Sequence, residues 1–214
     1  MELLKGVNLT HAYDYTLFEN INLSIHEKES IAVLGVSGCG KSTLLHILCT
    51  LLKPNLGEVY FNEKEIYSLK DDEKIKIRRN DFGIIFQSHY LFKGFSAYEN
   101  IELAAKLTKQ EIDEKILQKL KIQSVVKQSV GDLSGGQQQR ISIARVLSKK
   151  PKIIFADEPT GNLDKDTAND VMSVIFDYIQ EVSGALVLVT HDENLAKKCS
   201  TVYRLNEKKL EKIS

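Results

Sequence analysis

The segment IAVLGVSGCGKST, residues 31–43, decides the fold of this chain. Residues 31–34 form a short apolar run, which predicts a buried strand. A glycine-containing loop follows, and residues 41–43 then open the apolar-periodic segment LLHILCTLL, which predicts a helix. The loop matches the phosphate-binding pattern G-x-x-x-x-G-K-[ST] in the strand–loop–helix context that this pattern requires.

The residue types of this loop suit the phosphates of a nucleotide. Glycines let backbone N–H groups turn toward an anion, and the start of the following helix adds a partial positive charge. Lys41 is expected to reach the β- and γ-phosphates, and the Ser42 hydroxyl to ligate Mg²⁺. We therefore predict a nucleotide site at this loop.

The composition limits the class of protein. A length of 214 residues suits one large domain or a domain with a subdomain. The 29 basic residues balance the 29 acidic ones, so no basic field argues for nucleic acid as a partner. Three cysteines without metal-ligand spacing favour a reducing compartment. We see no signal peptide and no apolar run long enough to span a membrane, so a membrane role is expected to come through a partner.

Strand and helix patterns alternate along the chain, which indicates a mainly parallel sheet covered on both faces. Strands are predicted at residues 3–10, 21–25, 57–62, 82–86, 153–155 and 185–190, and in the segments STVYRL and KKLEKI. Helices are predicted at residues 71–79, in a helical region from 96 to about 128, in the segment ISIARVLSKK, and at residues 166–182.

Two carboxylates follow the strand predicted at residues 153–155. Asp157 is placed to hold Mg²⁺ opposite Ser42, and Glu158 to polarise an attacking water molecule. Such a pair is also compatible with an ordinary loop turn, but a phosphate loop in the same chain favours the catalytic interpretation.

The motif LSGGQ, residues 133–137, supplies a second helix start suited to phosphate. Ser134 resembles an N-cap, and Gly135 and Gly136 leave backbone N–H groups open. With GVSGCGKST, IIFADE and a histidine after a late strand, the sequence resembles the ATP-binding-cassette (ABC) family. The motifs occur in order, and the resemblance covers essentially the whole chain.

This resemblance implies an α/β protein with the P-loop NTPase fold of ABC type. It has a mainly parallel sheet core, an antiparallel β subdomain and a helical subdomain. Residues 1–214 are expected to form a single ATPase domain, with a RecA-like core at about 1–87 and 138–214 and the helical subdomain at about 88–137. The ligands implied are ATP and Mg²⁺.

The family resemblance also assigns roles to residues. Gln87 looks like the glutamine that senses Mg²⁺ and water, and His191 like the switch histidine at the γ-phosphate. Tyr13 best matches the aromatic residue that stacks on adenine, with Tyr15 as the alternative. Catalytic roles are thus implied for Glu158, His191, Gln87 and Lys41, and metal ligation for Ser42, Gln87 and Asp157. Nucleotide contacts are implied for Tyr13, Gly35, Val36, Ser37, Gly38, Cys39, Gly40, Lys41, Ser42, Thr43, Ser134, Gly135, Gly136, Gln137 and Asp164.

The resemblance further implies a head-to-tail homodimer that binds each ATP between the Lys41 loop of one subunit and residues 134–136 of the other. Its partners would be permease subunits in the membrane, with the ATPase held peripherally on the cytoplasmic face of a bacterial inner membrane. Tyr90, Phe92 and Phe95 lie where the family docks its permease, although they fit the core of the helical subdomain equally well.

Local segments indicate the branch. STLLHIL, the ENIEL stretch and ADEPTGNLD resemble the lipoprotein-releasing, macrolide-exporting and cell-division ATPases. A free-standing cassette fits the lipoprotein-releasing and cell-division types better than the macrolide exporters, whose cassette is usually fused to its permease, and lipoprotein release is the favoured function. The alternatives are a cell-division ATPase that regulates a periplasmic partner without transport, a macrolide or peptide exporter, and a soluble switch without a permease. Residues 130–132 depart from the family, because VGD replaces the usual proline-containing lead-in.

Overall fold

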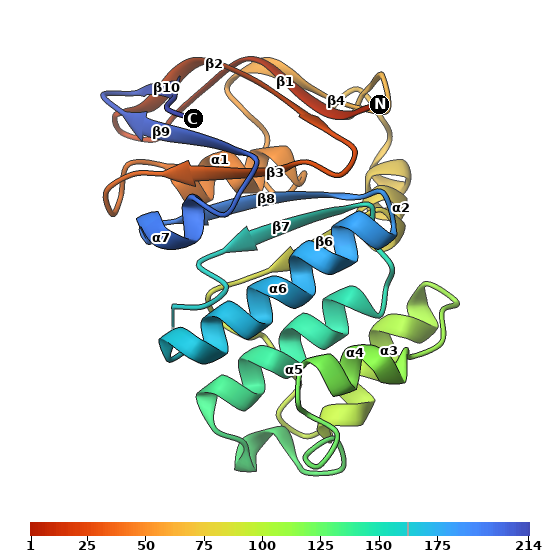
Figure 1. Ribbon diagram of the computed structural model, residues 1–214. Helices are drawn as coiled ribbons and strands as arrows, with labels where there is room; N and C mark the ends of the chain where they lie inside the picture. The colour runs from red at the N-terminus through yellow and green to blue at the C-terminus, as the bar shows by residue number, and fades with distance from the viewer. Residues whose placement is uncertain (162) are drawn as a thin grey trace.

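The computed structural model describes residues 1–161 and 163–214 as two sheets with helices around them (Figure 1). The first sheet is antiparallel and has four strands, in the order β2 (Thr16–His26), β1 (Glu2–Ala12), β4 (Leu56–Phe61) and β5 (Lys64–Glu65). The second has six, in the order β10 (Lys209–Lys212), β9 (Thr201–Asn206), β3 (Ser30–Leu34), β8 (Ala185–Thr190), β7 (Ile153–Asp157) and β6 (Phe82–Ile85). All pairs of the second sheet are parallel except β9–β10.

The central strands of the six-stranded sheet are buried on both faces. Along β3, Ile31 and Val33 point into one hydrophobic core, and Ala32 and Leu34 into the other. This follows from the two-residue period of a strand, and it explains why these strands are continuous apolar runs in the sequence. The prediction of a mainly parallel sheet covered on both faces is confirmed.

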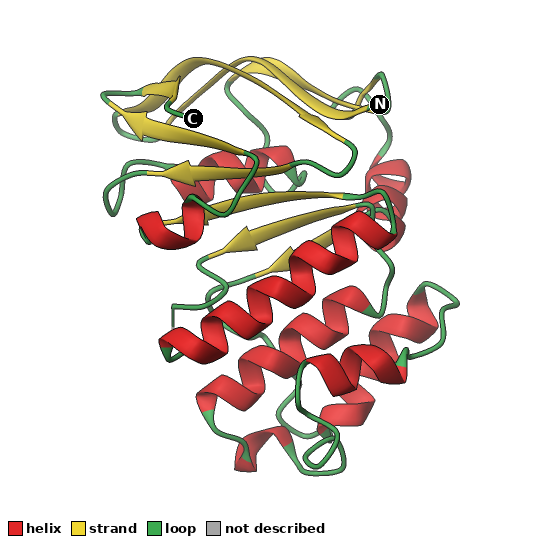
Figure 2. Cartoon of the chain, in the orientation of Figure 1, coloured by secondary structure: helices red, strands yellow, loops and turns green. Residues whose placement is uncertain are grey.

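The two faces of this sheet carry different layers. Helix α1 (Lys41–Leu48) shares one core with the antiparallel sheet, and it lies between the two sheets in Figure 1. The other face carries α3 (Ala97–Leu107), α5 (Gly135–Leu147) and α6 (Lys165–Glu181), which form the helical layer in the lower half of Figure 2. The remaining helices are α2 (Asp71–Asn80), α4 (Glu114–Lys119), the 3₁₀ turn η1 (Val130–Asp132) and α7 (Glu193–Ala196).

Most predicted elements occur where the sequence places them, and β8 has the predicted bounds. The differences lie at ends and in short elements. Strand β7 extends through Asp157, so this carboxylate is the last residue of the strand instead of lying beyond it. The helical region from 96 to 128 contains α3 and α4, separated by residues 108–113. The two-residue strand β5 and the four-residue helix α7 were not predicted, because elements this short carry too little periodicity.

Among residues 1–161 and 163–214, no helix combines the length and the apolar character needed to cross a membrane.

Candidate nucleotide-binding site

The phosphate loop connects the carboxyl end of β3 to the first turn of α1. At Gly35 a Cβ atom would lie 2.6 Å from the Cys39 Sγ and 2.8 Å from the Leu205 backbone oxygen, so no other residue fits there without movement. Gly40 has a φ of +103°, in the left-handed region that favours glycine. These two glycines are therefore required by the shape of the loop, as the motif predicts.

The start of α1 has free hydrogen-bonding capacity. Its N-cap, Gly40, supplies no side-chain acceptor, and no acidic residue lies in the first turn. The first backbone N–H groups of a helix have no partner within the helix and carry the positive end of its dipole. This end of α1 thus suits a phosphate group.

The Lys41 side chain is buried and folded back over the loop. Its Nζ donates hydrogen bonds to the backbone oxygens of Gly35 at 2.8 Å and Val36 at 2.9 Å. The ammonium group is thereby held against the backbone of the loop, and Lys41 lines the pocket between the loop and the strand ends.

Ser42 and Asp157 meet across 115 residues of sequence. The Ser42 hydroxyl donates to Asp157 Oδ1 at 3.0 Å, which joins the first turn of α1 to the end of β7. Burial raises the pKa of Asp157, and the Ser42 hydrogen bond opposes that shift. Gln87, two residues beyond β6, lines the same pocket. Hydroxyl, carboxylate and amide oxygens are the ligands that Mg²⁺ prefers, so these three residues fit this ion.

Glu158 is held by both its side chain and its backbone. Its Oε2 accepts a hydrogen bond from the Thr190 hydroxyl at 3.0 Å, and its Oε1 lies 2.7 Å from the Nδ1 of His191. Its φ of +45° lies in the left-handed region, a strained conformation for a glutamate that occurs preferentially at functional sites. The sequence analysis missed Thr190, whose only signal was its place directly before His191.

These side chains line one pocket of about 410 Å³ at the carboxyl ends of the parallel strands. Parallel strands end at the same edge of a sheet, and ligands of open α/β sheets bind outside that edge. The lining residues are Ser37, Gly38, Lys41, Ser42, Gln87, Asp157, Glu158 and His191. All predicted catalytic and metal-ligating residues are among them.

A second pocket, of about 230 Å³, lies beside the first. Tyr13 and Tyr15 line it together with Gly38, Gly40 and residues 41–43 of α1. Both tyrosines are mostly exposed, at 63% and 66%. A flat ring next to a phosphate-binding loop offers a stacking surface for a base, and both candidates meet this condition.

The remaining predicted nucleotide contacts lie apart from this pocket. Ser134 is the N-cap of α5, and its Oγ accepts a hydrogen bond from the Gln137 N–H at 3.3 Å. Gly135 is exposed and has open space where a Cβ would be. Asp164 is the exposed N-cap of α6. Hence the predicted N-cap at Ser134 is confirmed, but residues 134–137 and 164 do not line the pocket of Lys41 within one chain.

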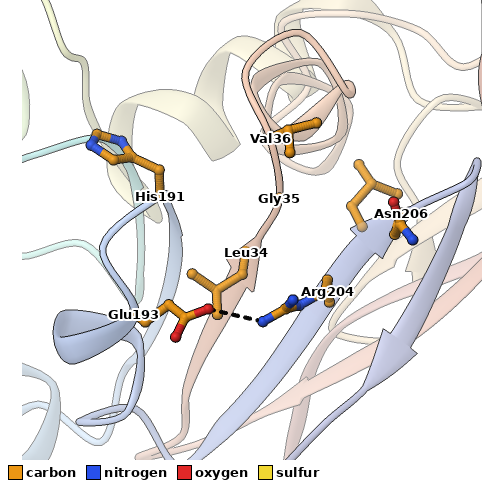
Figure 3. A pocket seen from close by; sticks show the side chains of 8 residues that line it. Leu34, Gly35, Val36, His191, Glu193, Arg204 and Asn206 are labelled. Carbon is orange, nitrogen blue, oxygen red and sulfur yellow. Dashed lines mark hydrogen bonds and ion pairs between the residues drawn. The ribbon is translucent and has the colours of Figure 1, made fainter.

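Figure 3 shows a further pocket, of about 340 Å³, which is lined by Gly35 and Val36 of the phosphate loop and by residues of α7 and β9. Arg204 of β9 donates a hydrogen bond to Glu193 Oε1 of α7 at 3.0 Å. His191 also lines this pocket, but its ring points away from the ion pair (Figure 3). Thus α7 and β9 border the space next to His191.

The family model described as ABC transporter matches residues 18–161, which span the phosphate loop, LSGGQ and Glu158. The chain belongs to the ABC transporter family. It is accordingly an ATP-binding protein and an ATPase.

Individual relatives cover nearly the whole chain. The lipoprotein-releasing system ATP-binding protein LolD of Bdellovibrio bacteriovorus is 40% identical, over 95% of this chain and 98% of the relative. An uncharacterised ABC transporter ATP-binding protein of Methanocaldococcus jannaschii is also 40% identical, over 91% of this chain and 89% of the relative. Among solved structures, the dimeric ATP-binding cassette MJ0796 bound to ADP and Pi matches with a TM-score of 0.89. It is 35% identical and covers 99% of both chains.

Proposed function

We propose that this chain is the ATP-hydrolysing subunit of a complex that releases lipoproteins from a bacterial inner membrane. The observation that carries the choice of lipoprotein release is the 40% identity to a lipoprotein-releasing ATP-binding protein along 95% of the chain. The site geometry supports the enzymatic part, because it places the side chains needed for phosphoryl transfer around one pocket.

In the proposed mechanism, the backbone N–H groups of the loop and of α1 hold the β- and γ-phosphates of ATP. Lys41 exchanges its hydrogen bonds to Gly35 and Val36 for the phosphate oxygens. Tyr13 stacks on the adenine ring. Mg²⁺ would be held by Ser42, Gln87 and Asp157, and it would supply positive charge that offsets the charge of the phosphates.

Glu158 is the proposed general base. Its carboxylate accepts a proton from a water molecule, whose oxygen forms a bond to the γ-phosphorus while the bond to ADP breaks. Thr190 and His191 orient the carboxylate through the two hydrogen bonds described above. Because the Nδ1 of His191 faces Glu158, its Nε2 is left for the γ-phosphate.

We further propose that two copies of the chain close on ATP head to tail. The exposed helix start at residues 134–137 supplies phosphate-binding N–H groups that the pocket of its own chain does not use. A second copy would bring this helix start to the γ-phosphate, and cleavage would remove the bridging group. The dimeric cassette bound to ADP and Pi supports this arrangement by its similarity.

The proposed permease contact involves residues 88–137, which we assign as the helical subdomain, with the core at 1–87 and 138–214. The structure places Tyr90, Phe92 and Phe95 at the surface, with 68%, 52% and 42% exposure, so their alternative placement in the core is wrong. Exposed aromatic residues in one loop are typical of an interaction site. We infer that they contact the permease, which would hold the ATPase at the cytoplasmic face of the membrane.

Affinity capture tests this proposal. Tagged Glu158→Gln protein is purified with ATP from detergent-solubilised native membranes, and the co-purifying chains are identified. We expect permease subunits together with acylated proteins. The matched control carries Tyr90→Ser and Phe92→Ser in addition, and should lose the permease while keeping its ATP affinity.

Three results would contradict the proposal. A permease captured together with cell-wall hydrolase activators would indicate the cell-division function. A captured permease of the macrolide- or peptide-exporting type would indicate the export function. Capture of no membrane protein would leave an ATPase without a transport role.

A further inference from the structure

A buried histidine lies directly below the predicted adenine-binding surface. His11, in β1, is 4% exposed, and neither ring nitrogen has a hydrogen-bond partner among the described residues. Burial lowers the pKa of His11, which favours the neutral ring. A histidine that neither donates nor accepts a hydrogen bond here serves through the shape and the aromatic character of its ring.

The His11 ring connects Tyr13 to the phosphate loop. It contacts Tyr13 edge to face, with ring centroids 4.9 Å apart and an interplanar angle of 83°. The ring of Phe18, the partner of His11 in the neighbouring strand β2, lies 6.3 Å away. Phe18 is fully buried and packs against Gly40, where a Cβ atom would lie 3.1 Å from its ring. A continuous row of rings therefore runs from the loop to Tyr13.

We propose that His11 is a positioning residue for nucleotide binding, which holds the exposed Tyr13 ring in the orientation on which adenine stacks. This inference rests on the proposed role of Tyr13 in ATP binding. A side chain with 63% exposure is free to change rotamer unless a neighbour restrains it. The edge-to-face contact supplies that restraint, so less rotamer freedom is lost when the base binds.

The same contact distinguishes the two candidate tyrosines. Tyr13 has a fixed ring partner, whereas Tyr15 has no ring contact among the described residues. Both line the pocket, but only Tyr13 is held in place before the nucleotide arrives. The geometry therefore favours Tyr13 as the stacking residue.

The test compares two ligands that share the phosphate site. ATP has a base, whereas inorganic tripolyphosphate has none, and the affinity of the wild-type chain for each is measured by calorimetry. His11→Leu fills the same space without an aromatic edge and should raise the Kd for ATP about 2- to 10-fold. The Kd for tripolyphosphate should not change. His11→Phe keeps a ring and should retain the wild-type affinity for ATP.

Two controls complete the experiment. His26→Leu changes an exposed histidine at the far end of β2 and should leave both affinities unchanged. In a Tyr13→Ala background, His11→Leu should have no further effect on ATP binding, because the ring that it positions is gone.

An unchanged Kd for ATP in His11→Leu would overturn the inference. So would an equal loss of affinity for ATP and tripolyphosphate, which indicates a general disturbance of the loop. A wild-type chain that binds neither ligand would instead overturn the proposed ATP site itself.

Discussion

At the scale of single residues, Glu158 is constrained in both its side chain and its backbone. Both carboxylate oxygens are engaged, one by Thr190 and one by His191, and the backbone is held at a φ of +45°. Conformational strain of this kind costs about 1–3 kcal/mol and persists only where surrounding contacts enforce it. The constraint keeps the carboxylate aimed into the pocket before ATP binds.

Glu158→Gln is expected to lower kcat by roughly 10²–10⁴, the range for loss of a general base. Glutamine keeps the size of the side chain and one acceptor oxygen but cannot take up a proton as the carboxylate does, so the Kd for ATP should be unchanged and the closed dimer should accumulate. Steady-state hydrolysis and ATP titration measure the two effects. Glu193→Gln, a matched change outside this pocket, should keep wild-type turnover, and near-normal turnover of Glu158→Gln would refute the assignment.

Alkylation of Cys39 is expected to block ATP binding, because the Sγ packs against Gly35 inside the phosphate loop. Reaction should be selective. Cys39 is partly exposed, whereas Cys49 and Cys199 are buried, and burial raises their pKa values to about 12 and about 11. ATP affinity is measured after treatment with N-ethylmaleimide, with Cys39→Ser as the resistant control. An unchanged affinity for ATP after complete modification of Cys39 would contradict this prediction.

At the scale of elements, the site depends on where helices begin. Helix α1 presents uncapped N–H groups to the pocket, whereas α5 begins with Ser134 and Gln137 hydrogen-bonded to each other's backbone N–H. This capping box gives hydrogen-bond partners to the backbone N–H groups of Ser134 and Gln137, and it fixes the direction in which helix α5 begins. The open N–H groups after Ser134 remain available to a ligand supplied by another chain.

Ser134→Ala is expected to lower the free energy of unfolding by about 1 kcal/mol through loss of the cap. It should weaken ATP-dependent dimerisation in the Glu158→Gln background, while the ATP affinity of the single subunit stays unchanged. Light scattering and calorimetry measure these properties. Ser96→Ala removes an equivalent capping box from α3 and should affect stability alone. Equal dimerisation of both variants would argue against a role of α5 in closure.

At the scale of the whole molecule, the stability of the fold and the proposed function make opposite demands on the charge of Asp157, at the proposed magnesium site. Burial raises the pKa of Asp157, so the folded state disfavours the ionised carboxylate that the proposed metal site needs. A carboxyl group with a raised pKa contributes stability while protonated, and this contribution is lost as pH rises through its folded-state pKa.

Asp157→Asn is therefore expected to raise the melting temperature at pH 7, measured in EDTA so that no metal contributes. The difference should shrink as pH falls through the raised pKa of Asp157, because the carboxyl group then becomes protonated in the folded state. Asp164→Asn is a control for which the opposite change in melting temperature is expected, because the hydrogen bond from the backbone N–H of Thr167 lowers the pKa of Asp164. That variant should lose stability at pH 7 and approach the wild type at low pH. A lower melting temperature of Asp157→Asn at pH 7 would contradict this reasoning.

Much of the fold could be predicted from the sequence because strong local patterns specify it. Buried parallel strands are continuous apolar runs, such as residues 185–190, and the phosphate loop has a fixed spacing. Strand β5 and helix α7 could not be predicted, because two and four residues show no usable period. The exposure of Tyr90, Phe92 and Phe95 was equally inaccessible, since an aromatic residue in a loop suits either the core or the surface.

By itself, the sequence determined the phosphate loop, the strand–helix alternation, the ABC family and the identity of the chemical groups, because each depends on residues close together in the chain. Only the tertiary structure decided which groups meet. The hydrogen bonds of Ser42 with Asp157 and of Thr190 with Glu158 join residues 115 and 32 positions apart. The contact of His11 with Phe18 likewise depends on how β1 pairs with β2, whereas His11 and Tyr13 lie close together in the chain. The parallel sheet makes these contacts possible, because it brings the carboxyl ends of strands that are far apart in the sequence to one edge. No local sequence pattern specifies which strands become neighbours in the sheet.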